Sequence, residues 1–255
     1  MLIEALKYLT TPCPAPYRRI GYLKELIATE ASFKRNRATW QPHLDRTRAV
    51  IIKAAEQVTR KDTVIVLGAG MLADIPLDRL AHAFGRVRLV DVCFLNETRR
   101  AATFYSNVEL EHHDVTGIVA PLLSREVPQP RLPSGLSLGD ADLVISANVL
   151  AQLPLIPLDY LRRQRPSIDD EELEAFAQAI IRSHLGLLET CAGAVCLVTE
   201  VERQVRDGER LVESVDPLRG VLPDREGDEW VWDIAPRPEL LPDADIRNRV
   251  RGMVW

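Results

Sequence analysis

One stretch near the first third of the chain constrains the fold more than any other. Residues 63–67, Thr-Val-Ile-Val-Leu, form a short apolar run rich in β-branched side chains, and Gly68-Ala69-Gly70 follows at once. A strand without polar alternation belongs in the middle of a parallel sheet, where helices cover both faces. The stretch therefore predicts an α/β fold built around a buried parallel strand.

The rest of the chain after residue 62 repeats this unit. Helical segments with apolar residues at i, i+3, i+4 and i+7, such as 76–84, alternate with short strand-like segments, and Ser167 is expected to open a long helix. This alternation indicates right-handed βαβ units. We predict a doubly wound, mostly parallel seven-stranded sheet with an antiparallel strand near the C-terminus. The predicted strands are 63–67, 87–92, 107–115, 141–150, 193–201, 229–235 and 249–255.

The residues before the first strand differ in pattern and in charge. They read as interrupted helices, so we predict an N-terminal helical cap over residues 1–61 and a Rossmann-like domain over 62–255. Residues 1–61 hold 12 Lys and Arg against 5 Asp and Glu, whereas the remaining residues hold 20 against 32. Two interpretations stay open: the cap docks on its own acidic domain, or it meets an anionic ligand or nucleic acid.

Two further features bear on location. No apolar run approaches the ~18 residues that a membrane helix requires, and the first residues lack the basic start of a signal peptide. The cysteines at 13, 93, 191 and 196 form no Cys-x-x-Cys pair and no metal-ligand spacing with a histidine. We therefore expect separate, reduced thiols and a cytoplasmic protein without a membrane partner.

The glycines after the first strand predict a ligand. Glycine lets a backbone turn sharply and approach a bound molecule, and ligands of such sheets bind at the carboxyl ends of the strands. Asp91 ends the second predicted strand at about the 20-residue spacing at which an acid holds ribose hydroxyls. Gly68 to Ala73 also fits a dinucleotide loop, but Pro76 lies where the second turn of its helix would be.

From Asp62 to about Glu200 the chain resembles the class I S-adenosylmethionine-dependent methyltransferases. The matching pieces are Val-Ile-Val-Leu-Gly-Ala-Gly, Val-Arg-Leu-Val-Asp-Val, Val-Glu-Leu-Glu-His-His-Asp-Val and Ala-Asp-Leu-Val-Ile-Ser-Ala-Asn-Val-Leu-Ala-Gln-Leu-Pro, in this order. The chain departs from the family pattern at Leu72, where a third glycine is usual, and at Gln152, where many small-molecule enzymes have histidine.

The resemblance implies S-adenosyl-L-methionine as the cofactor and a role for each motif. The loop after the first strand would approach the methionine part, the acid ending the second strand would hold the ribose, the acid after the third would meet the adenine, and the exit of the fourth would line the transfer site. The cofactor-binding residues implied are Gly68, Ala69, Gly70, Asp91, Val92, Asp114, Val115 and Asn148.

The cap supplies the candidates for the reaction itself. Methyl transfer is an in-line displacement in which positioning does most of the work, and a base is needed only for a protonated nucleophile. His43 is the candidate general base. The candidate substrate residues are Tyr17, Trp40, Arg48 and Gln152, with Tyr22 as a further aromatic side chain for a cation or substrate. His112 and His113 face opposite sides of a strand, so no metal site is predicted.

Three functions fit these features of the sequence. The leading one is a methyltransferase acting on a small or medium-sized acceptor. The second is an NAD-dependent oxidoreductase, which the glycine loop and Asp91 also fit. The third is a non-catalytic S-adenosylmethionine- or RNA-binding protein that uses the basic cap. A small-molecule substrate is favoured as the partner, and nucleic acid stays open.

Overall fold

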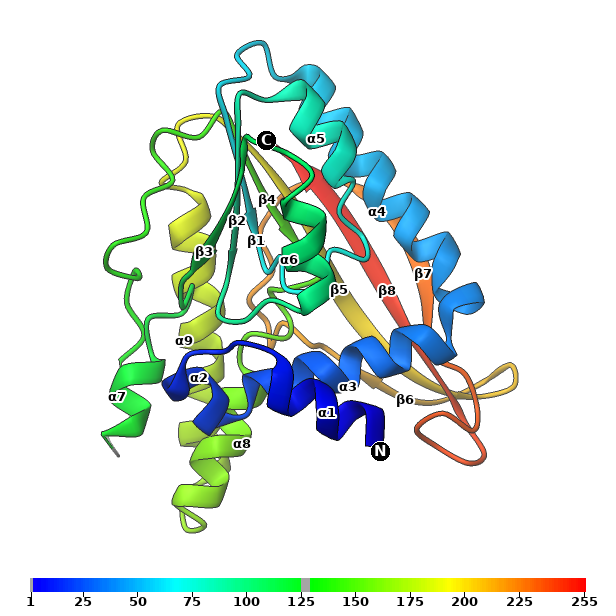
Figure 1. Cartoon of the computed structure of the whole chain (residues 1–255). Helices are drawn as coiled ribbons and strands as arrows, with labels where there is room; N and C mark the ends of the chain where they lie inside the picture. Colours follow the sequence, from blue (N-terminus) through cyan, green and yellow to red (C-terminus); the bar gives the residue numbers. More distant parts are fainter. Residues whose placement is uncertain (1, 125–128) are drawn as a thin grey trace.

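The computed structural model describes residues 2–124 and 129–255. An eight-stranded sheet forms its centre (Figure 1) in the order β3-β2-β1-β4-β5-β8-β7, with β6 paired to β5 outside this path. β1 to β5 run parallel, and β6 and β8 pair antiparallel with β5. The strands are β1 (Thr63–Leu67), β2 (Arg86–Asp91), β3 (Val108–His112), β4 (Leu143–Ala147), β5 (Ala194–Asp207), β6 (Arg210–Val215), β7 (Asp228–Ala235) and β8 (Asp245–Val254).

The fold class is the predicted one, a mostly parallel α/β sheet with antiparallel strands at the C-terminal end. The continuous path has the seven expected strands, and β6 is an eighth that the sequence analysis missed. β5 is also longer than predicted, because it continues to Asp207 and forms a hairpin with β6. All six residues of β6 are exposed, so this hairpin carries no core pattern that would reveal it.

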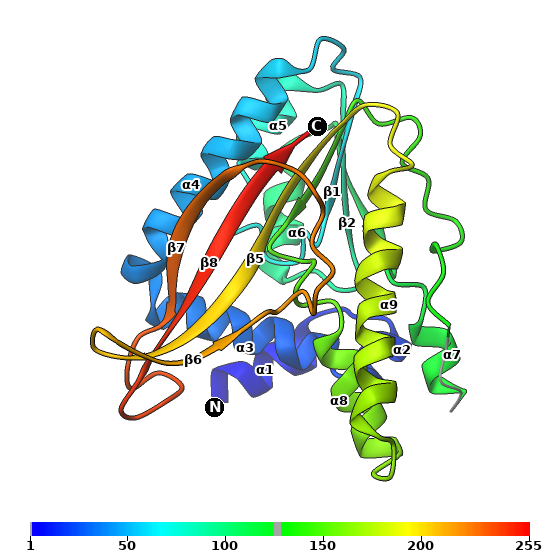
Figure 2. The ribbon, with the colours of Figure 1, turned by 180° about the vertical axis from the view of Figure 1, so that it is seen from behind.

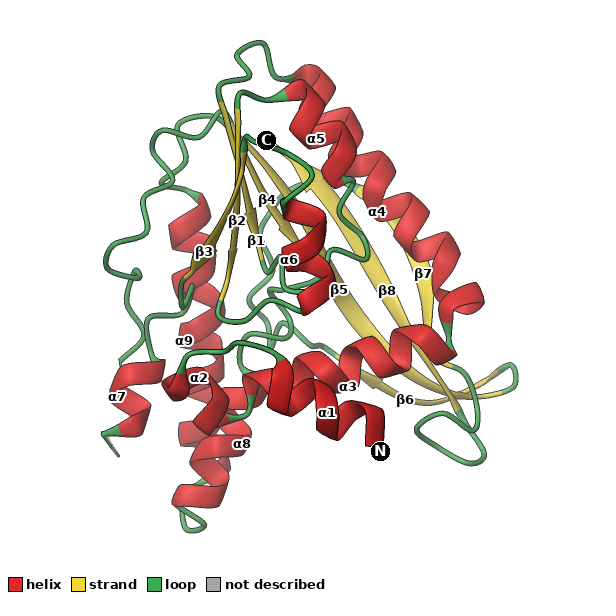
Figure 3. Cartoon of the chain, viewed as in Figure 1, coloured by secondary structure: helices red, strands yellow, loops and turns green. Residues whose placement is uncertain are grey.

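Helices cover the sheet on both faces (Figures 2 and 3). On β1, Val64 and Val66 pack in the cluster that includes α4 and α5, whereas Ile65 and Leu67 pack in the cluster that includes α9. This double burial explains why residues 64–67 of β1 are all apolar. The helices are α1 (Leu2–Thr10), α2 (Ala15–Ile20), α3 (Tyr22–Arg35), α4 (Arg37–Gln57), α5 (Leu77–Ala83), α6 (Asn96–Ala102), α7 (Val119–Leu123), α8 (Leu155–Gln164) and α9 (Asp170–Leu188).

The start of α9 corrects one expectation. The helix begins at Asp170 rather than near Ser167. Asp169 is its N-cap, and the Asp169 carboxylate accepts a hydrogen bond of 2.6 Å from the backbone N–H of Glu172. An aspartate at this position pairs with a backbone N–H that the helix itself leaves unpaired. Its negative charge also interacts favourably with the positive end of the helix dipole.

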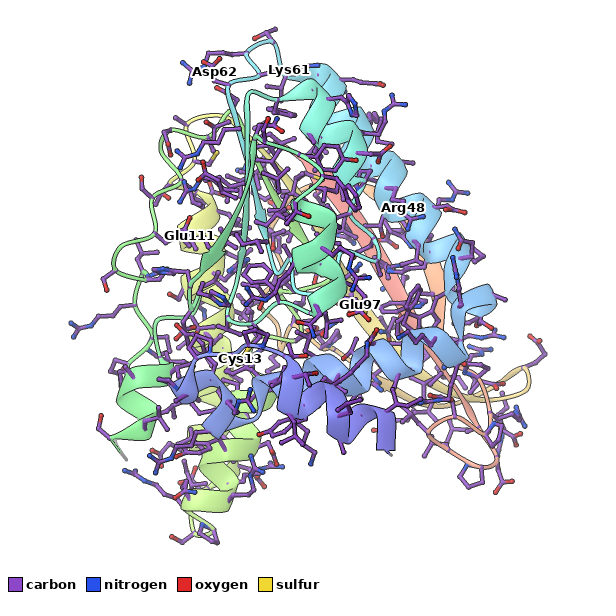
Figure 4. The ribbon with its side chains drawn as sticks, viewed as in Figure 1. Cys13, Arg48, Lys61, Asp62, Glu97 and Glu111 are labelled. Atoms are coloured by element: carbon purple, nitrogen blue, oxygen red, sulfur yellow. A yellow bond between two sulfur atoms is a disulfide. The ribbon has the colours of Figure 1, made fainter. Side chains whose placement is uncertain are left out.

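The cap helices α1, α2 and α3 lie across the carboxyl ends of the parallel strands (Figure 1). Their basic residues meet acids of the main domain: Lys7 pairs with Glu97 at 2.8 Å, and Arg35 pairs with Glu239 at 2.6 Å. In Figure 4, Glu97 lies next to these helices. These contacts favour the interpretation in which the basic front end docks on its own acidic domain.

Helix α4 belongs to both parts of the molecule. Its first turns carry Trp40 and His43, whereas Ile51 and Ala54, nearer its end, are fully buried in the cluster that includes β1 and β4. The predicted domain boundary at residue 61 therefore lies just after a helix whose C-terminal part packs on the sheet of the main domain.

The cysteine expectation was wrong for two of the four residues. Cys13, which follows α1 and is labelled in Figure 4, forms a disulfide with Cys93 in the loop after β2. The two residues are 80 apart in sequence, but docking of the cap brings their Cα atoms to 5.3 Å, within the range of disulfides. Cys191 and Cys196 are free thiols. Cysteine spacing alone could not reveal a bridge that depends on the cap's position.

None of the helices in residues 2–124 and 129–255 is long and apolar enough to cross a membrane.

Candidate functional site

A cavity of about 1210 Å³, which includes space open to solvent, lies where β1, β2 and β4 end beneath α3 and α4. This is the edge at which doubly wound sheets bind ligands. Most of the residues predicted from the sequence meet here. Those that line the cavity are Trp40, His43, Gly68, Gly70, Asp91, Val92, Asp114, Val115, Asn148 and Gln152.

The loop after β1 requires its glycines. Gly68 has a left-handed backbone, with φ of +79°, and a Cβ placed there would lie 2.1 Å from Cγ2 of Val149. A Cβ on Gly70 would lie 2.9 Å from the carbonyl oxygen of Cys93. The missing side chains let this loop pack directly against the exits of β4 and β2. Three strand ends are thereby brought together around one cavity.

Asp91 lies in the cavity wall with its carboxylate held by the backbone. Its Oδ2 accepts a 2.9 Å hydrogen bond from the N–H of Gly70, and its Oδ1 accepts a 3.3 Å hydrogen bond from the N–H of Cys93. Burial raises the pKa of Asp91 to about 6, although these N–H groups act in the opposite direction. The group is thus ionised at neutral pH, and each oxygen can accept a further hydrogen bond.

Asp114 shapes the loop that follows β3. Its carboxylate accepts hydrogen bonds of 2.9 Å from the backbone N–H groups of Thr116 and Val119, the second of which begins α7. These bonds fix the loop at the rim of the cavity, which Asp114, Val115 and Thr116 line. An acid here is therefore required by the local backbone as well as being available to a ligand.

Asn148 connects three parts of the site at the exit of β4. Its backbone has a φ of +55°, a left-handed conformation that asparagine adopts more readily than most residues other than glycine. Its Nδ2 donates a 2.6 Å hydrogen bond to Oδ2 of Asp74 and lies 3.1 Å from Nε2 of His43. Asn148 thus contacts both the loop after β1 and the cap helix α4.

His43 is almost fully buried, with 1% of its surface exposed. Trp230 donates a hydrogen bond of 3.1 Å from its indole N–H to Nδ1 of His43, and the imidazole stacks on Trp232 with ring centres 4.0 Å apart. A neutral imidazole that accepts at Nδ1 carries its proton on Nε2, so no free lone pair remains for a substrate proton. The 3.1 Å approach of Nε2 to Nδ2 of Asn148 then joins two donors and is a packing contact, not a hydrogen bond. The geometry favours a positioning role over the predicted general base.

The electrostatic state of His43 can be measured directly. Burial lowers the pKa of His43 to about 3, so we expect the ring to be uncharged at every pH between 5 and 8. The His43 ring signals in a two-dimensional NMR spectrum, assigned by loss in His43→Gln, should not shift across this range. A histidine-containing peptide in the same sample serves as the control. A His43 signal that titrates together with the peptide would contradict the buried arrangement.

Three predicted residues do not line the cavity. Ala69, the middle residue of the glycine loop, is fully buried in the hydrophobic core. Tyr17 packs edge-on against Tyr22, which does line the cavity, with ring centres 6.4 Å apart. Arg48, labelled on α4 in Figure 4, donates a hydrogen bond to the carbonyl of Ala73 and so holds the loop after β1 from outside.

Several lining residues were not predicted, notably Asp74 and Trp232. Burial raises the pKa of Asp74, and the hydrogen bond from Asn148 opposes this effect. Trp232 comes from β7, the strand at the edge of the sheet next to β8. The alternation Trp-Val-Trp at 230–232 was a signal for it, because it places two indoles on one strand face.

No group of three or more His, Cys, Asp or Glu residues in 2–124 and 129–255 is placed to hold a metal ion.

Comparisons with known proteins give structural matches only. No family model matches this chain, and no curated protein sequence matches it. Among solved structures, it is similar to a Burkholderia thailandensis 1,6-didemethyltoxoflavin-N1-methyltransferase with bound 1,6-didemethyltoxoflavin and S-adenosylhomocysteine, at 14% identity over 96% of this chain and 92% of the other, with a TM-score of 0.44.

Two further structures are similar at comparable levels. A complex of DhpI with S-adenosylhomocysteine is 16% identical over 88% of this chain and 93% of the other, with a TM-score of 0.35. The glycopeptide N-methyltransferase MtfA with S-adenosylmethionine is 13% identical over 80% and 75%, with a TM-score of 0.34. A shared fold does not by itself imply a shared activity, so function has to be argued from the site.

Proposed function

We propose that the chain is an S-adenosylmethionine-dependent methyltransferase that acts on a small or medium-sized acceptor. The observation that carries the proposal is the meeting of Gly68, Gly70, Asp91, Asp114 and Asn148 on one cavity beneath the cap. These residues belong to separate motifs whose order along the chain resembles that family. Their convergence supports one shared ligand rather than independent structural roles.

The cavity fits an adenosyl ligand in several respects. Asp91 would hold the ribose hydroxyls with the lone pairs that Gly70 and Cys93 leave free. Val92 and Val115, both lining the cavity, would flank the adenine beside Asp114. The backbone of the glycine loop, without Cβ atoms, would approach the methionine part.

The proposed catalysis rests on alignment. S-adenosylmethionine supplies an activated methyl group on a sulfonium, and the chain's contribution is to orient the acceptor behind it and to exclude water. The linked contacts of Asn148, Asp74 and His43 would fix the exit of β4 where the acceptor meets the methyl group. No lone pair of His43 is needed for this role.

Two observations weigh against the alternative functions. Helix α5 begins only at Leu77, after Pro76 as its N-cap, so no helix N-terminus follows the glycine loop directly as a dinucleotide pyrophosphate requires. The ion pairs of Lys7 and Arg35 with the main domain use part of the basic charge that an RNA-binding surface would need.

The disulfide also bears on the cellular location of the protein. Cytoplasmic residence was predicted from separate thiols, and the Cys13–Cys93 disulfide weighs against it, because such bonds are rare in reducing compartments.

Calorimetric titration tests the proposed function. We expect S-adenosylmethionine and S-adenosylhomocysteine to bind with one site each, and NADH not to bind. A folded sample that binds neither adenosyl compound would refute the proposal, and saturable binding of NADH alone would replace it with the oxidoreductase.

The pKa of Asp91 predicts how the binding depends on pH. Its value of about 6 means that Asp91 is ionised at pH 7 and largely protonated at pH 5. A protonated carboxyl loses its charge and part of its accepting capacity, so affinity for S-adenosylhomocysteine should fall roughly tenfold between pH 7 and pH 5. Calorimetry at both values measures the change, and an affinity that is independent of pH would contradict ribose binding by this carboxylate.

A further inference from the structure

A second cavity adjoins the first on the side of the antiparallel strands. It measures about 1940 Å³, including space open to solvent, and lies between α3 of the cap and strands β5, β7 and β8. Glu25, Trp40, Gln152 and Trp232 line both cavities. A molecule bound in the second cavity, called here the acceptor chamber, would therefore adjoin a ligand in the first.

The wall of the acceptor chamber contains unpaired polar atoms. Glu200, Asn248 and Trp232 line it, and their exposed fractions are 4%, 3% and 5%. Oε2 of Glu200, Oδ1 of Asn248 and Nε1 of Trp232 have no hydrogen-bond partner among the described residues. Each such buried atom costs free energy until it is paired. Three of them in one wall indicate a site made for a polar ligand.

The sheet register explains why these side chains lie together. Asn248 on β8 is the direct partner of Trp232 on β7. Glu200 on β5 is opposite Val250, two residues from Asn248 and thus on the same face of the sheet. The three residues come from neighbouring strands, which hold their positions rigidly. Arg203, opposite Asn248 on β5, adds a cationic donor to the chamber lining.

The unpaired atoms define the chemistry of a complementary ligand. Glu200 and Asn248 offer oxygens that accept hydrogen bonds, whereas Trp232 and Arg203 offer donors. A ligand that pairs them needs N–H groups beside a carbonyl oxygen. Trp40 and Trp232, whose rings meet edge-on at 84° with centres 5.0 Å apart, add apolar edges to the lining, and one face of Trp232 is covered by His43. An aromatic carboxylate, by contrast, has no N–H group to donate to Glu200 or Asn248.

We propose that the acceptor chamber binds a planar nitrogen heterocycle with a lactam edge, in which N–H and C=O groups alternate. Its N–H groups donate to Glu200 and Asn248, and its carbonyl accepts from Trp232. That this heterocycle is the methyl acceptor rests on the proposed function, whereas its binding does not.

Ligand-observed NMR titration with two probes of similar size tests the proposal. Lumazine, a fused bicyclic heterocycle with lactam edges, is expected to bind, and naphthalene-2-carboxylate is expected to bind at least tenfold more weakly. Trp232→Phe keeps an aromatic ring but removes the N–H, and Asn248→Leu removes the acceptor. Each should lower the affinity for lumazine roughly fivefold. Glu213→Gln, on the exposed strand β6, is the matched control and should change nothing.

The outcomes separate this proposal from the previous one. Equal binding of the two probes, or lumazine affinity that is unchanged in both Trp232→Phe and Asn248→Leu, would overturn the lactam assignment. Trp232→Phe is conservative enough to keep the fold, which circular dichroism verifies. Failure of S-adenosylmethionine to bind in calorimetry would refute the methyltransferase while leaving the lumazine result to decide the chamber.

Discussion

Replacement of Asp91 by asparagine is expected to lower the affinity for S-adenosylmethionine roughly 10- to 150-fold, because a hydrogen bond to a charged group is worth about 1.5–3 kcal/mol. The amide removes the charge. It also turns an NH₂ group towards the N–H of either Gly70 or Cys93, both of which now donate to the carboxylate. Calorimetry at pH 7.5, with thermal unfolding as the test of folding, measures the loss.

The matched control is Asp62→Asn. Asp62 has a side chain that is 75% exposed and directly precedes β1, at the opposite end of the molecule from Cys13 and helices α1 to α3 (Figure 4). The same chemical change there should leave the affinity intact. The assignment would be contradicted if Asp91→Asn kept the wild-type affinity, or if both variants lost affinity equally. Either result would show that the side chain at position 91 does not bind the ligand.

Loss of the Cys13–Cys93 disulfide is expected to destabilise the protein by about 4 kcal/mol, because the bond closes a long loop in the unfolded chain. For a chain of this length that corresponds to a fall in Tm of roughly 10 °C. Either Cys13→Ser or a dithiol reductant should produce it. The cap should stay docked through Lys7–Glu97 and the buried side chains of Leu23 and Ile27, so the variant should still fold.

Cys191→Ser is the control for this experiment, because Cys191 is a half-buried free thiol. It should melt close to the wild type, and reductant should lower the Tm of Cys191→Ser but not that of Cys13→Ser. An unchanged Tm in Cys13→Ser under oxidising conditions would contradict the bridge. Since Cys93 lines the ligand cavity, we also expect weaker binding of S-adenosylhomocysteine once the bond is absent.

The elements that sequence predicted well are those whose burial is simple. β1 occupies the predicted residues because both of its faces are covered, and β4 is buried throughout in the same way. β2 has this pattern only in part, because it includes Arg86 and Arg88. The C-terminal part of β5 and all of β6 were not predicted, because these segments project from the core and their side chains are half-buried or exposed. A hydrophobic pattern predicts only those strands that bury at least one face in the core.

The site was predictable where a single strand exit determines the residue. Gly68, Gly70 and Asp91 follow from the first two strands alone. Asp74, Trp232 and the disulfide depend instead on how distant segments dock, which no local pattern encodes. The same holds for His43. The sequence suggested it as a site residue, but its loss of a free Nδ1 could not be predicted, because the indole that donates to Nδ1 comes from β7, far away in the sequence.

The placement of α4 limits how a ligand can enter. One end of this continuous helix is locked into the sheet core by Ile51 and Ala54, and the other end holds Trp40 and His43 over the cavity. The part of the cavity wall that α4 forms therefore cannot move away without disrupting the hydrophobic core. Residues 2–35 are held as well, because the Cys13–Cys93 disulfide ties them to the loop after β2. Ligand access therefore falls to the part of the cavity that is open to solvent.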